Sequence, residues 1–449
     1  MTFPTWLAPW CAFAAAATYD SLAAPVVARA KLAMLDTLGA IAAGHQEPEV
    51  QALVRRLATP TGAGAPVIGT RAHADPATAA LLNGIAGTSL ELDEGNRFAR
   101  GHPAIHVLPA ALVAGQRLAS SGRELLLAFA LGYEIAARIG AAANLRPGFH
   151  PHGTWGVVGA ALAVARLHGA DAARLAETIN IASSLSLATS MRTAIEGGTV
   201  RNAYAGVANQ LGLLAWDLAA SGFTGERDGV ATVFGQIAGR DFKPEAMTEA
   251  LGSRWEVARN YFKRHACCRY NHGMLDALEI LVAENGTIAA DDVAEVTVET
   301  YAAAAELADP RPRNALAAKF SLPFAAAAFL VRGAADMPAF RAEARGDAAI
   351  LDLAARVHVR EEPGFTARLP AARPARVAVA LRDGRRLVAE TMTNRGDADS
   401  PYPVAEIEAK FLTLAADGWS EPRARSLMAS VLGLEDAPDI RAFCALLTS

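Results

Sequence analysis

Cysteine is scarce in this sequence, with four residues in a chain of 449. Two of them, Cys267 and Cys268, are adjacent, whereas thiolate metal sites need pairs spaced by two to four residues so that both sulfurs face one ion. A Cys-x-x-Cys redox motif is absent, and iron–sulfur clusters generally need more cysteines. Four cysteines make no disulfide framework for so long a chain, which predicts a reducing, cytoplasmic location.

A dominant charge is lacking as well. Lysine and arginine number 42 against 46 aspartates and glutamates, a net charge of −4, which leaves no basic field for nucleic acid. No lysine or arginine precedes the first apolar run, so residues 4–18 are predicted as a first helix and not a secretory signal. Glu134 and Arg138 interrupt the apolar stretch 125–145, which predicts a buried helix and no membrane partner.

Alanine-rich stretches with helical spacing make up most of the chain before residue 260. Hydrophobic residues are 52 % of the sequence and charged residues 20 %, proportions typical of a globular protein. Apolar residues recur at three- and four-residue intervals in 22–44, 154–169 and 200–222, and each stretch ends on a glycine that we expect to be a left-handed helix stop. Small side chains would let these helices approach closely.

Alternating stretches rich in valine and threonine follow after residue 290. Segments 293–301, 375–383 and 385–393 are predicted strands, with a tight hairpin at Gly384 between the last two. A helix is predicted over 316–333, between the first strand and the second.

The pattern therefore runs from helical to mixed and back to helical, and a chain of this length is expected to form two domains. We predict a mainly α fold, in which a large all-helical domain is built from both chain ends, residues 1–262 and 403–449. A smaller α+β lid domain, residues 263–402, is inserted between them.

Histidines gather in three short, turn-rich segments, 91–106, 149–156 and 263–272. Six of the ten histidines lie there: His102, His106, His150, His152, His265 and His272. Reactive residues are often carried by loops on a rigid scaffold, so the clustering favours a functional site. We expect the segments to meet in one positively charged cleft between the two domains.

The first of these segments combines acids, arginines and a histidine. A carboxylate such as Asp93 beside His102 can fix the tautomer of the ring and raise its basicity, which suits a general base. Arg97 and Arg100 add positive charge to the same loop. The alternative is a solvated loop whose ion pairs are incidental.

Two other segments suit an anionic ligand. In GGTVRNAYAG (197–206), Arg201 offers a planar fork for a carboxylate, and Tyr204, on the same helix face, can donate a proton; an ordinary first-turn pair is the alternative. In KRHACCRYNH (263–272), cations and histidines surround a helix start near residue 270 and favour an anion over a metal ion. A basic hinge with two buried cysteines is the alternative there.

With these segments, the chain resembles the MmgE/PrpD family from end to end. Its members include 2-methylcitrate dehydratase, cis-aconitate decarboxylase and iminodisuccinate epimerase. The matching motifs, in order, are AKLAMLDTLGAIAAG (30–44), the acidic-to-His-Pro segment (91–103), GFHPHGTWGVVGAALAVARLHG (148–169), YAGVANQLGLLA (204–215), HACCRYNH (265–272), DPRPRNALAAKFSLPFAAA (309–327) and RGDADSPYPVAEIEAKF (395–411).

The resemblance implies a helical domain and an α+β lid, usually in a homodimer, with the site in the cleft between them. It also implies chemistry on di- or tricarboxylic acids without metal or organic cofactor. By position, Asp93 matches the first of two family acids, His102 the histidine of a His-Pro pair, and His150 the histidine that follows an aromatic residue. Lys263 and His272 match the first and last residues of the lid-entrance motif.

The sequence departs from the family pattern at several positions. The second acid is Glu94, and Gly95 follows where relatives often have serine or threonine. Arg201 replaces a lysine, Tyr204 replaces a histidine, and Cys268 stands where the decarboxylase has histidine. The full decarboxylase constellation is therefore not present, which lowers the expectation of that activity.

We expect a cofactor-independent lyase whose leading reaction is dehydration of a hydroxylated di- or tricarboxylic acid. Removal of a proton next to a carboxylate creates an enolate-like charge that the site must stabilise. The expected site residues are Asp93, His102, His150, Tyr204 and His272 for catalysis, and Arg97, Arg100, Arg201, Lys263 and Cys268 for substrate binding.

Among these, Lys263 and Arg201, with Arg97 or Arg100, would clamp carboxylates. His102 or His150 would act as the base, oriented by Asp93, and Tyr204 or the other histidine would protonate the leaving hydroxyl. The alternatives are an epimerase or isomerase of a dicarboxylate, a decarboxylase of an aconitate-like acid, and a carboxylate-binding protein without catalysis.

Overall fold

The computed structural model describes residues 4–59 and 64–449, and its fold is mainly α, as predicted. The helices before residue 260 are α1 Leu7–Ala16, α2 Ala24–Gly44, α3 Pro48–Leu57, α4 Pro76–Ser89, α5 Pro103–Leu118, α6 Gly122–Ala142, α7 Gly156–Leu167, α8 Ala172–Ser184, α9 Met191–Ile195, α10 Ala203–Ala220 and α11 Glu245–Thr248. Later helices are α12 His272–Asn285, α13 Ala302–Ala305, α14 Ala315–Lys319, α15 Leu322–Arg332, α16 Ala342–Arg345, α17 Ala348–Ala354, α18 Pro363–Thr366, α19 Val404–Ala415, α20 Glu421–Leu432 and α21 Arg441–Leu446. The strands are β1 Ala65–Pro66, β2 His73–Ala74, β3 Ala143–Leu145, β4 Gly239–Phe242, β5 Val293–Thr300, β6 Val357–Glu361, β7 Ala375–Leu381 and β8 Arg386–Thr391.

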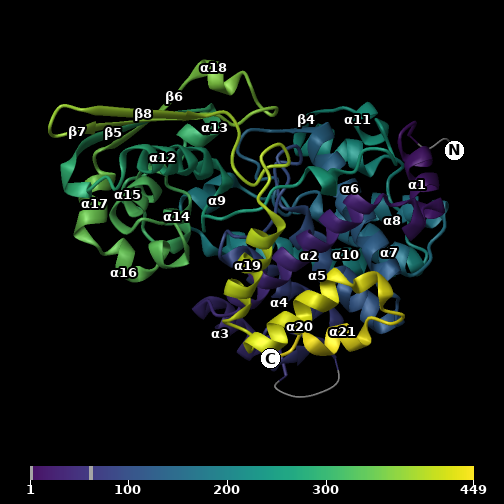
Figure 1. The fold of residues 1–449 in the computed structure, drawn as a ribbon. Coiled ribbons are helices and arrows are strands. Elements are labelled where there is room, and N and C mark those ends of the chain that lie inside the picture. The colour runs from purple at the N-terminus through teal and green to yellow at the C-terminus, as the bar shows by residue number, and fades with distance from the viewer. Residues whose placement is uncertain (1–3, 60–63) are drawn as a thin grey trace.

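Helices from both ends of the chain pack together. The C-terminal helices α19 to α21, drawn in yellow in Figure 1, lie against α2 and α5. Their side chains Phe411 and Val431 belong to the same hydrophobic core as Trp10 and Phe129 from the first half. The early and late helical stretches thus bury one common apolar interior.

Glycines bring several helix backbones into contact. A Cβ atom on Gly84 of α4 would lie 2.6 Å from the Cα atom of Gly206 on α10. Likewise, a Cβ on Gly132 of α6 would lie 2.6 Å from the carbonyl oxygen of Gly159 on α7. Real Cβ atoms do not approach other atoms so closely, so only glycine fits, and the predicted close approach of helices is confirmed.

The main sheet has the strand order β6-β5-β7-β8. Strand β5 is parallel to β6 and antiparallel to β7, with Val298 opposite Val377, and β7 is antiparallel to β8. Helices α12 and α15 pack against the sheet (Figure 1) and share a second core with it that includes Leu278 and Phe324. Figure 1 shows this sheet at the opposite side of the molecule from α20 and α21.

Glycine predictions were confirmed at three positions and wrong at one. Gly169 (φ +72°) and Gly222 (φ +92°) follow α7 and α10 in the left-handed conformation, and Gly384 (φ +90°) lies in the turn between β7 and β8. Gly44, however, is the last helical residue of α2 and is not among the left-handed glycines. A Cβ there would lie 1.9 Å from the carbonyl oxygen of Ala86, so Gly44 serves close packing.

The predicted helix 316–333 is two helices, α14 and α15. The chain breaks at Ser321, whose side chain accepts a hydrogen bond from the Phe324 N–H, and Pro323 stands in the first turn of α15. A serine cap followed by proline is a helix start, and it overrides the continuous helical spacing. Strand β6 was not predicted at all.

The stretch predicted as a buried helix is α6. It is the one helix among the described residues that is long and apolar enough to cross a membrane, and 94 % of its apolar window is buried inside the fold. Within it, Arg138 donates to Glu134 over 2.6 Å. The domain boundaries at 262/263 and 402/403 stay a prediction, because α19 contributes Phe411 to the first core and Leu414 to the second.

Candidate active site

Side chains from several separate segments line a cavity of about 40 Å³, where the three histidine-bearing segments meet. The lining residues are Glu91, Arg100, His102, His150, Pro151, Met191, Arg201, Tyr261, Cys268, Arg269, Tyr270, Phe320 and Arg373. A water molecule needs roughly 10–15 Å³ of such space, so the cavity holds only a few waters. Five of the ten residues predicted for the site line it: Arg100, His102, His150, Arg201 and Cys268.

A larger hollow, of about 710 Å³, borders the same region. Leu92 and Lys263 line it together with residues of α19. Its described lining includes no histidine and is mostly apolar, whereas the smaller cavity holds histidines, arginines and a carboxylate. The smaller cavity is therefore the candidate active site.

His102 is held in one tautomer. It is the N-cap residue of α5, with Pro103 in the first turn, and its Nδ1 lies 2.7 Å from the carbonyl oxygen of Glu94 and 3.1 Å from Oδ2 of Asp93. Because a carbonyl oxygen only accepts hydrogen bonds, Nδ1 carries the proton. In the neutral ring Nε2 is therefore unprotonated and can accept a proton from the substrate.

Asp93 is buried behind His102 and stays ionised. Its exposed fraction is 1 %, and burial alone would raise its pKa. The nearby His102 and Lys263, whose Nζ lies 3.7 Å from Oδ1, hold the pKa of Asp93 well below its usual range instead. A fixed negative charge therefore faces Nδ1 of His102.

His150 has the opposite tautomer. Its Nδ1 accepts the backbone N–H of His152 over 2.9 Å, so in the neutral ring the proton is on Nε2. Burial, reinforced by the charge of Arg201, holds the pKa of His150 well below its usual range. His150 is thus a neutral hydrogen-bond donor, whereas Nδ1 of His102 faces a carboxylate.

Two further histidines lie behind this pair. Nδ1 of His106 lies 2.8 Å from the carbonyl oxygen of His102, and its Nε2 accepts the Gly153 N–H over 2.9 Å, so both nitrogens are engaged. His152 is buried between the rings of His102, His106 and His150, with centroids 4.5–5.5 Å apart. Neither ring nitrogen of His152 has a hydrogen-bond partner within the described chain.

Glu91 holds the two cations that were expected to bind substrate. Its carboxylate pairs with the guanidinium of Arg201 and lies 3.4 Å from Nζ of Lys263, which also donates to the Glu91 carbonyl over 3.0 Å. Although burial opposes ionisation, both cations lower the pKa of Glu91 below its usual range. Glu91 adopts φ +56°, a strained conformation for a residue with a side chain, which often marks a functional site.

Lys263 therefore does not line the smaller cavity, although it borders the larger hollow. Glu91 and Asp93 raise its pKa against the effect of burial, so the ammonium stays charged. Lys263 stands behind Glu91, one contact away from the cavity that Glu91 lines.

Arg100, Arg269 and Arg373 complete the positive lining. Arg100, itself at φ +57°, donates to the carbonyls of Gly140 and Ala143 at the end of α6. Arg269 pairs with Asp397 at 2.8 Å, and Arg373 donates to the Arg97 carbonyl over 3.1 Å. Arg269 and Arg373 come from parts of the chain after residue 263, so the cavity is walled from both sides of the predicted boundary.

The structure supports Cys268 and Tyr204 less strongly as site residues. Burial raises the pKa of Cys268 to about 11, so this lining thiol is protonated at neutral pH. Tyr204 is half-buried and its ring centroid lies 6.4 Å from that of His150, but it is not among the described residues that line the cavity.

Arg97 and His272 are placed elsewhere. Arg97 is bound to Asp397 and Asp399, at 3.3 and 3.0 Å, and its guanidinium joins two loops. His272 accepts from Arg269 over 2.9 Å at Nδ1, and its Nε2 lies 3.4 Å from the Cys267 carbonyl. Neither side chain is among the described cavity lining, so the substrate-binding part of Arg97 and the catalytic part of His272 stay predictions.

Glu94, the second acid of the first segment, lies apart from the cavity lining. Tyr133 donates to its Oε1 over 2.5 Å, and the Ala104 N–H to its Oε2 over 3.3 Å. Burial raises the pKa of Glu94 to about 8, so its carboxyl is mostly protonated at neutral pH. Glu94 therefore adds no charge to the site, whereas Glu91 and Asp93 do.

The sequence pattern did not single out Glu91, Tyr261 or Arg373 as site residues, and it noted Arg269 only within the cationic group of 263–272. Glu91 lies two residues before Asp93, and an acid at that spacing was a usable signal. Nothing near Arg373 in the sequence distinguishes it from other surface arginines, because its place depends on how the loop before β7 packs.

Comparisons with known proteins agree with this architecture. The family model for the MmgE/PrpD N-terminal domain matches residues 10–244, and that for the MmgE/PrpD C-terminal domain matches residues 265–436. The chain is 28 % identical to a cis-aconitate decarboxylase-like protein of Aspergillus oryzae, over 96 % of this chain and 94 % of the relative.

Other relatives carry the decarboxylase name itself. Cis-aconitate decarboxylase of Aspergillus terreus is 27 % identical, over 97 % of this chain and 94 % of the relative. The enzyme of that name from Mus musculus is 24 % identical, over 83 % and 78 %. Since both domain models match in order and cover most of the chain, the protein belongs to the MmgE/PrpD family.

Proposed function

We propose that this protein is a lyase that removes carbon dioxide from an aconitate-like polycarboxylic acid. The observation that carries the proposal is the nearly full-length match to proteins named cis-aconitate decarboxylase, at 24–27 % identity. A cavity lined by arginines and histidines supports it, because a substrate with several carboxylates needs such partners. Decarboxylation thus takes precedence over the dehydration that the sequence pattern favoured.

In this reaction a carboxylate leaves as carbon dioxide, and the electron pair of the broken carbon–carbon bond stays on the substrate. That pair then accepts one proton, so one carboxylate is exchanged for one hydrogen. His102, whose Nδ1 faces Asp93 and the Glu94 carbonyl oxygen, delivers that proton from Nε2. Neutral His150 donates a hydrogen bond from Nε2 to a substrate oxygen.

Arg201 and Arg373 bind the carboxylates that remain. Arg201 is already paired with Glu91, so a substrate carboxylate shares this cation or displaces the acid. Because a few waters fill the cavity of about 40 Å³, a six-carbon acid requires a wider form of the site. The homodimer, the cytoplasmic location and the lack of a metal or organic cofactor in catalysis belong to the same proposal.

A dehydratase acting on a hydroxylated di- or tricarboxylic acid is the second candidate. The departures from the decarboxylase pattern favour it, and Cys268 above all, because its thiol stays neutral where the decarboxylase has a histidine. In that reaction Nε2 of His102 would remove the proton, and His150 would donate to the leaving hydroxyl.

The two candidates differ in what they release. The protein is incubated with cis-aconitate and, separately, with citrate and 2-methylcitrate in heavy water, and proton NMR and carbon dioxide release are recorded. A decarboxylase releases carbon dioxide and places one deuterium on the product. Loss of water without carbon dioxide indicates the dehydratase, and proton exchange alone indicates an epimerase.

The matched variants are His102→Gln in the cavity and His168→Gln on the surface. Turnover should be lost in the first and kept in the second. Thermal stabilisation by these acids without any product would show a carboxylate-binding protein and overturn the proposal.

A further inference from the structure

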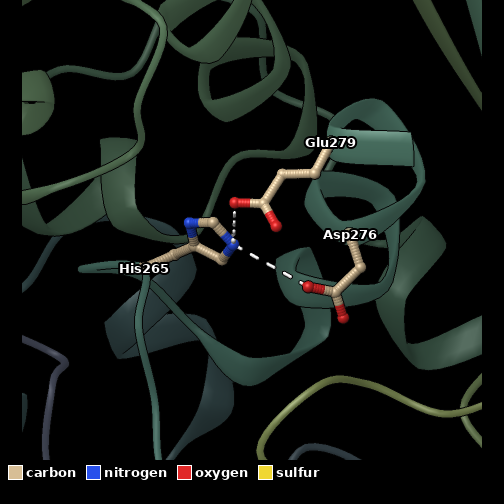
Figure 2. A group of neighbouring side chains, drawn as sticks. All are labelled: His265, Asp276 and Glu279. Carbon is tan, nitrogen blue, oxygen red and sulfur yellow. Dashed lines mark ion pairs between the residues drawn. The ribbon is translucent and has the colours of Figure 1, made fainter. Parts of the chain in front are cut away.

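A second group of ionisable side chains lies outside the cavity, at the beginning of α12 (Figure 2). Asp276 and Glu279 are three residues apart on this helix and so share a face. Nε2 of His265, in the segment leading to the helix, lies 3.9 Å from Oδ1 of Asp276 and 3.9 Å from Oε1 of Glu279. The three ligand atoms lie within 4.8 Å of one another.

These atoms are buried without ordinary partners. His265 is 3 % exposed and Asp276 is 4 % exposed, yet Nε2 of His265 and Oδ1 of Asp276 have no hydrogen-bond partner in the described part of the chain. A separation of 3.9 Å is too long for a hydrogen bond, and an unpaired buried polar atom is costly. The other Asp276 oxygen accepts the Arg395 N–H over 2.8 Å, so only Oδ1 is free.

The spacing suits an ion between the three atoms. Zinc bonds imidazole nitrogen and carboxylate oxygen at about 2.0–2.2 Å, so its ligand atoms stand roughly 3–4 Å apart. A proton shared directly between His265 and a carboxylate would instead draw the two atoms to about 2.7–2.9 Å. Figure 2 shows the imidazole and both carboxylates directed at one point.

We propose that His265, Asp276 and Glu279 form a binding site for one divalent transition-metal ion, with Zn²⁺ the best match. One imidazole and two carboxylates are ligands of the type zinc takes, and the two negative charges balance the ion. Asp276 and Glu279 also line a hollow of about 660 Å³, from which water can supply a fourth ligand.

Two arginines now neutralise Glu279. Arg264 and Arg395 lie 3.6 and 3.7 Å from its carboxylate, but their side chains are 54 % and 47 % exposed. Being half in solvent, they can turn away when a cation takes that oxygen, and long exposed ion pairs contribute little. His265 belongs to a segment that the sequence pattern assigned to an anion site, but its ring faces these carboxylates.

The metal ion would stabilise the fold around it and would not contact the substrate. It ties the segment of Lys263 and Cys268 to α12, and Asp276 also holds the loop that carries Asp397, the partner of Arg269. The ion would therefore stiffen one wall of the cavity. This inference does not depend on the proposed function, because metal binding is measured without any substrate.

The test uses the untagged full-length protein, treated with a chelator and then titrated with Zn²⁺ by calorimetry. Co²⁺, followed by its visible absorption, is the second probe. We expect one ion per chain and a higher melting temperature with the metal. His265→Gln, Asp276→Asn and Glu279→Gln should each weaken binding by about tenfold or more.

The matched control is Glu284→Gln, an exposed acid on the same helix, which should bind Zn²⁺ as the wild type does. Absence of one-to-one binding, or equal binding by the three ligand variants and the control, would overturn the proposal. Should a variant fail to fold, the wild type decides alone: a melting temperature that does not respond to Zn²⁺ or Co²⁺ would overturn the proposal.

Discussion

Oδ2 of Asp93 lies 3.1 Å from the protonated Nδ1 of His102; both residues are buried, and His102 lines the cavity. Together with the Glu94 carbonyl oxygen, 2.7 Å from the same nitrogen, this carboxylate holds the ring in the tautomer protonated at Nδ1. Nε2 of His102 is therefore the best-prepared proton-transfer atom in the described site.

Replacing His102 by Gln should lower kcat by roughly 10²–10⁴-fold, the contribution of a positioned acid or base. Asp93→Asn should lower it as well, and the double variant should be hardly worse than His102→Gln, because the two residues act as one unit. Steady-state kinetics with cis-aconitate measure this effect, and melting temperatures show that the variants fold. Unchanged turnover in His102→Gln would remove the ring from the mechanism.

The two cavity histidines should show opposite tautomers. We expect proton–nitrogen correlation spectra of histidine-labelled protein at pH 7.5 to place the proton of His150 on Nε2 and that of His102 on Nδ1. His150 should remain neutral on acidification to pH 5.5, because burial lowers its pKa. A His150 signal that titrates near pH 6.5 would contradict its burial beside Arg201.

Glu91→Gln should destabilise the fold strongly. Removing this carboxylate leaves Arg201 and Lys263 buried without their common partner, which costs about 3–5 kcal/mol of unfolding free energy. Chemical denaturation measures the change. The matched control is Glu196→Gln, whose exposed pair with Arg192 contributes less than about 0.5 kcal/mol. Equal losses in both variants would show that the Glu91 cluster is not held as described.

Glu94 should make the fold less stable as pH rises. Its folded pKa of about 8 exceeds the usual value, so between about pH 4.5 and pH 8 the folded state holds a proton that the unfolded state has lost. This stability is full below pH 4.5 and is lost as pH rises through 8, at about 1.4 kcal/mol per unit. Unfolding at pH 5.5 and 7.5 should show a smaller loss in Glu94→Gln than in the wild type or in Glu284→Gln.

The cysteines should be inert in the folded protein. All four are free and buried, and burial raises the pKa of Cys268 to about 11 and that of Cys11 to about 12. Because the thiolate is the reactive form, a thiol reagent at pH 8 should modify almost none of them until denaturant is added. Rapid modification of a cysteine in the native state would contradict its burial.

The sequence indicated the helical scaffold well because periodicity is a local signal. Spacing of apolar residues located α2, α7 and α10 to within a few residues, and alternation located β5, β7 and β8. Strand β6 was missed because it is short, VHVRE, with charged residues at its end, and its parallel pairing with β5 is set by distant residues. The break at Ser321 was missed because apolar spacing continues across it.

The site was harder to predict than the fold. His102, Asp93 and His150 stand in turns whose composition draws attention, so local pattern was enough to find them. Which cation faces the cavity depends on partners distant in sequence. Arg97 is occupied by Asp397 and Asp399, about 300 residues away, whereas Arg373, whose side chain donates to the Arg97 carbonyl, lines the cavity.

The glycine contacts between α4 and α10, and between α6 and α7, have a mechanical consequence. At these glycines the main chains approach so closely that a single added methyl group has no room, which restricts sliding of the helices past each other. The packed helices α4, α6, α7 and α10 therefore form a rigid base of the molecule. A larger substrate must therefore be admitted by displacement of Tyr270, Phe320 and Arg373 on the facing wall, so loosening mutations there should alter entry rates while leaving the base intact.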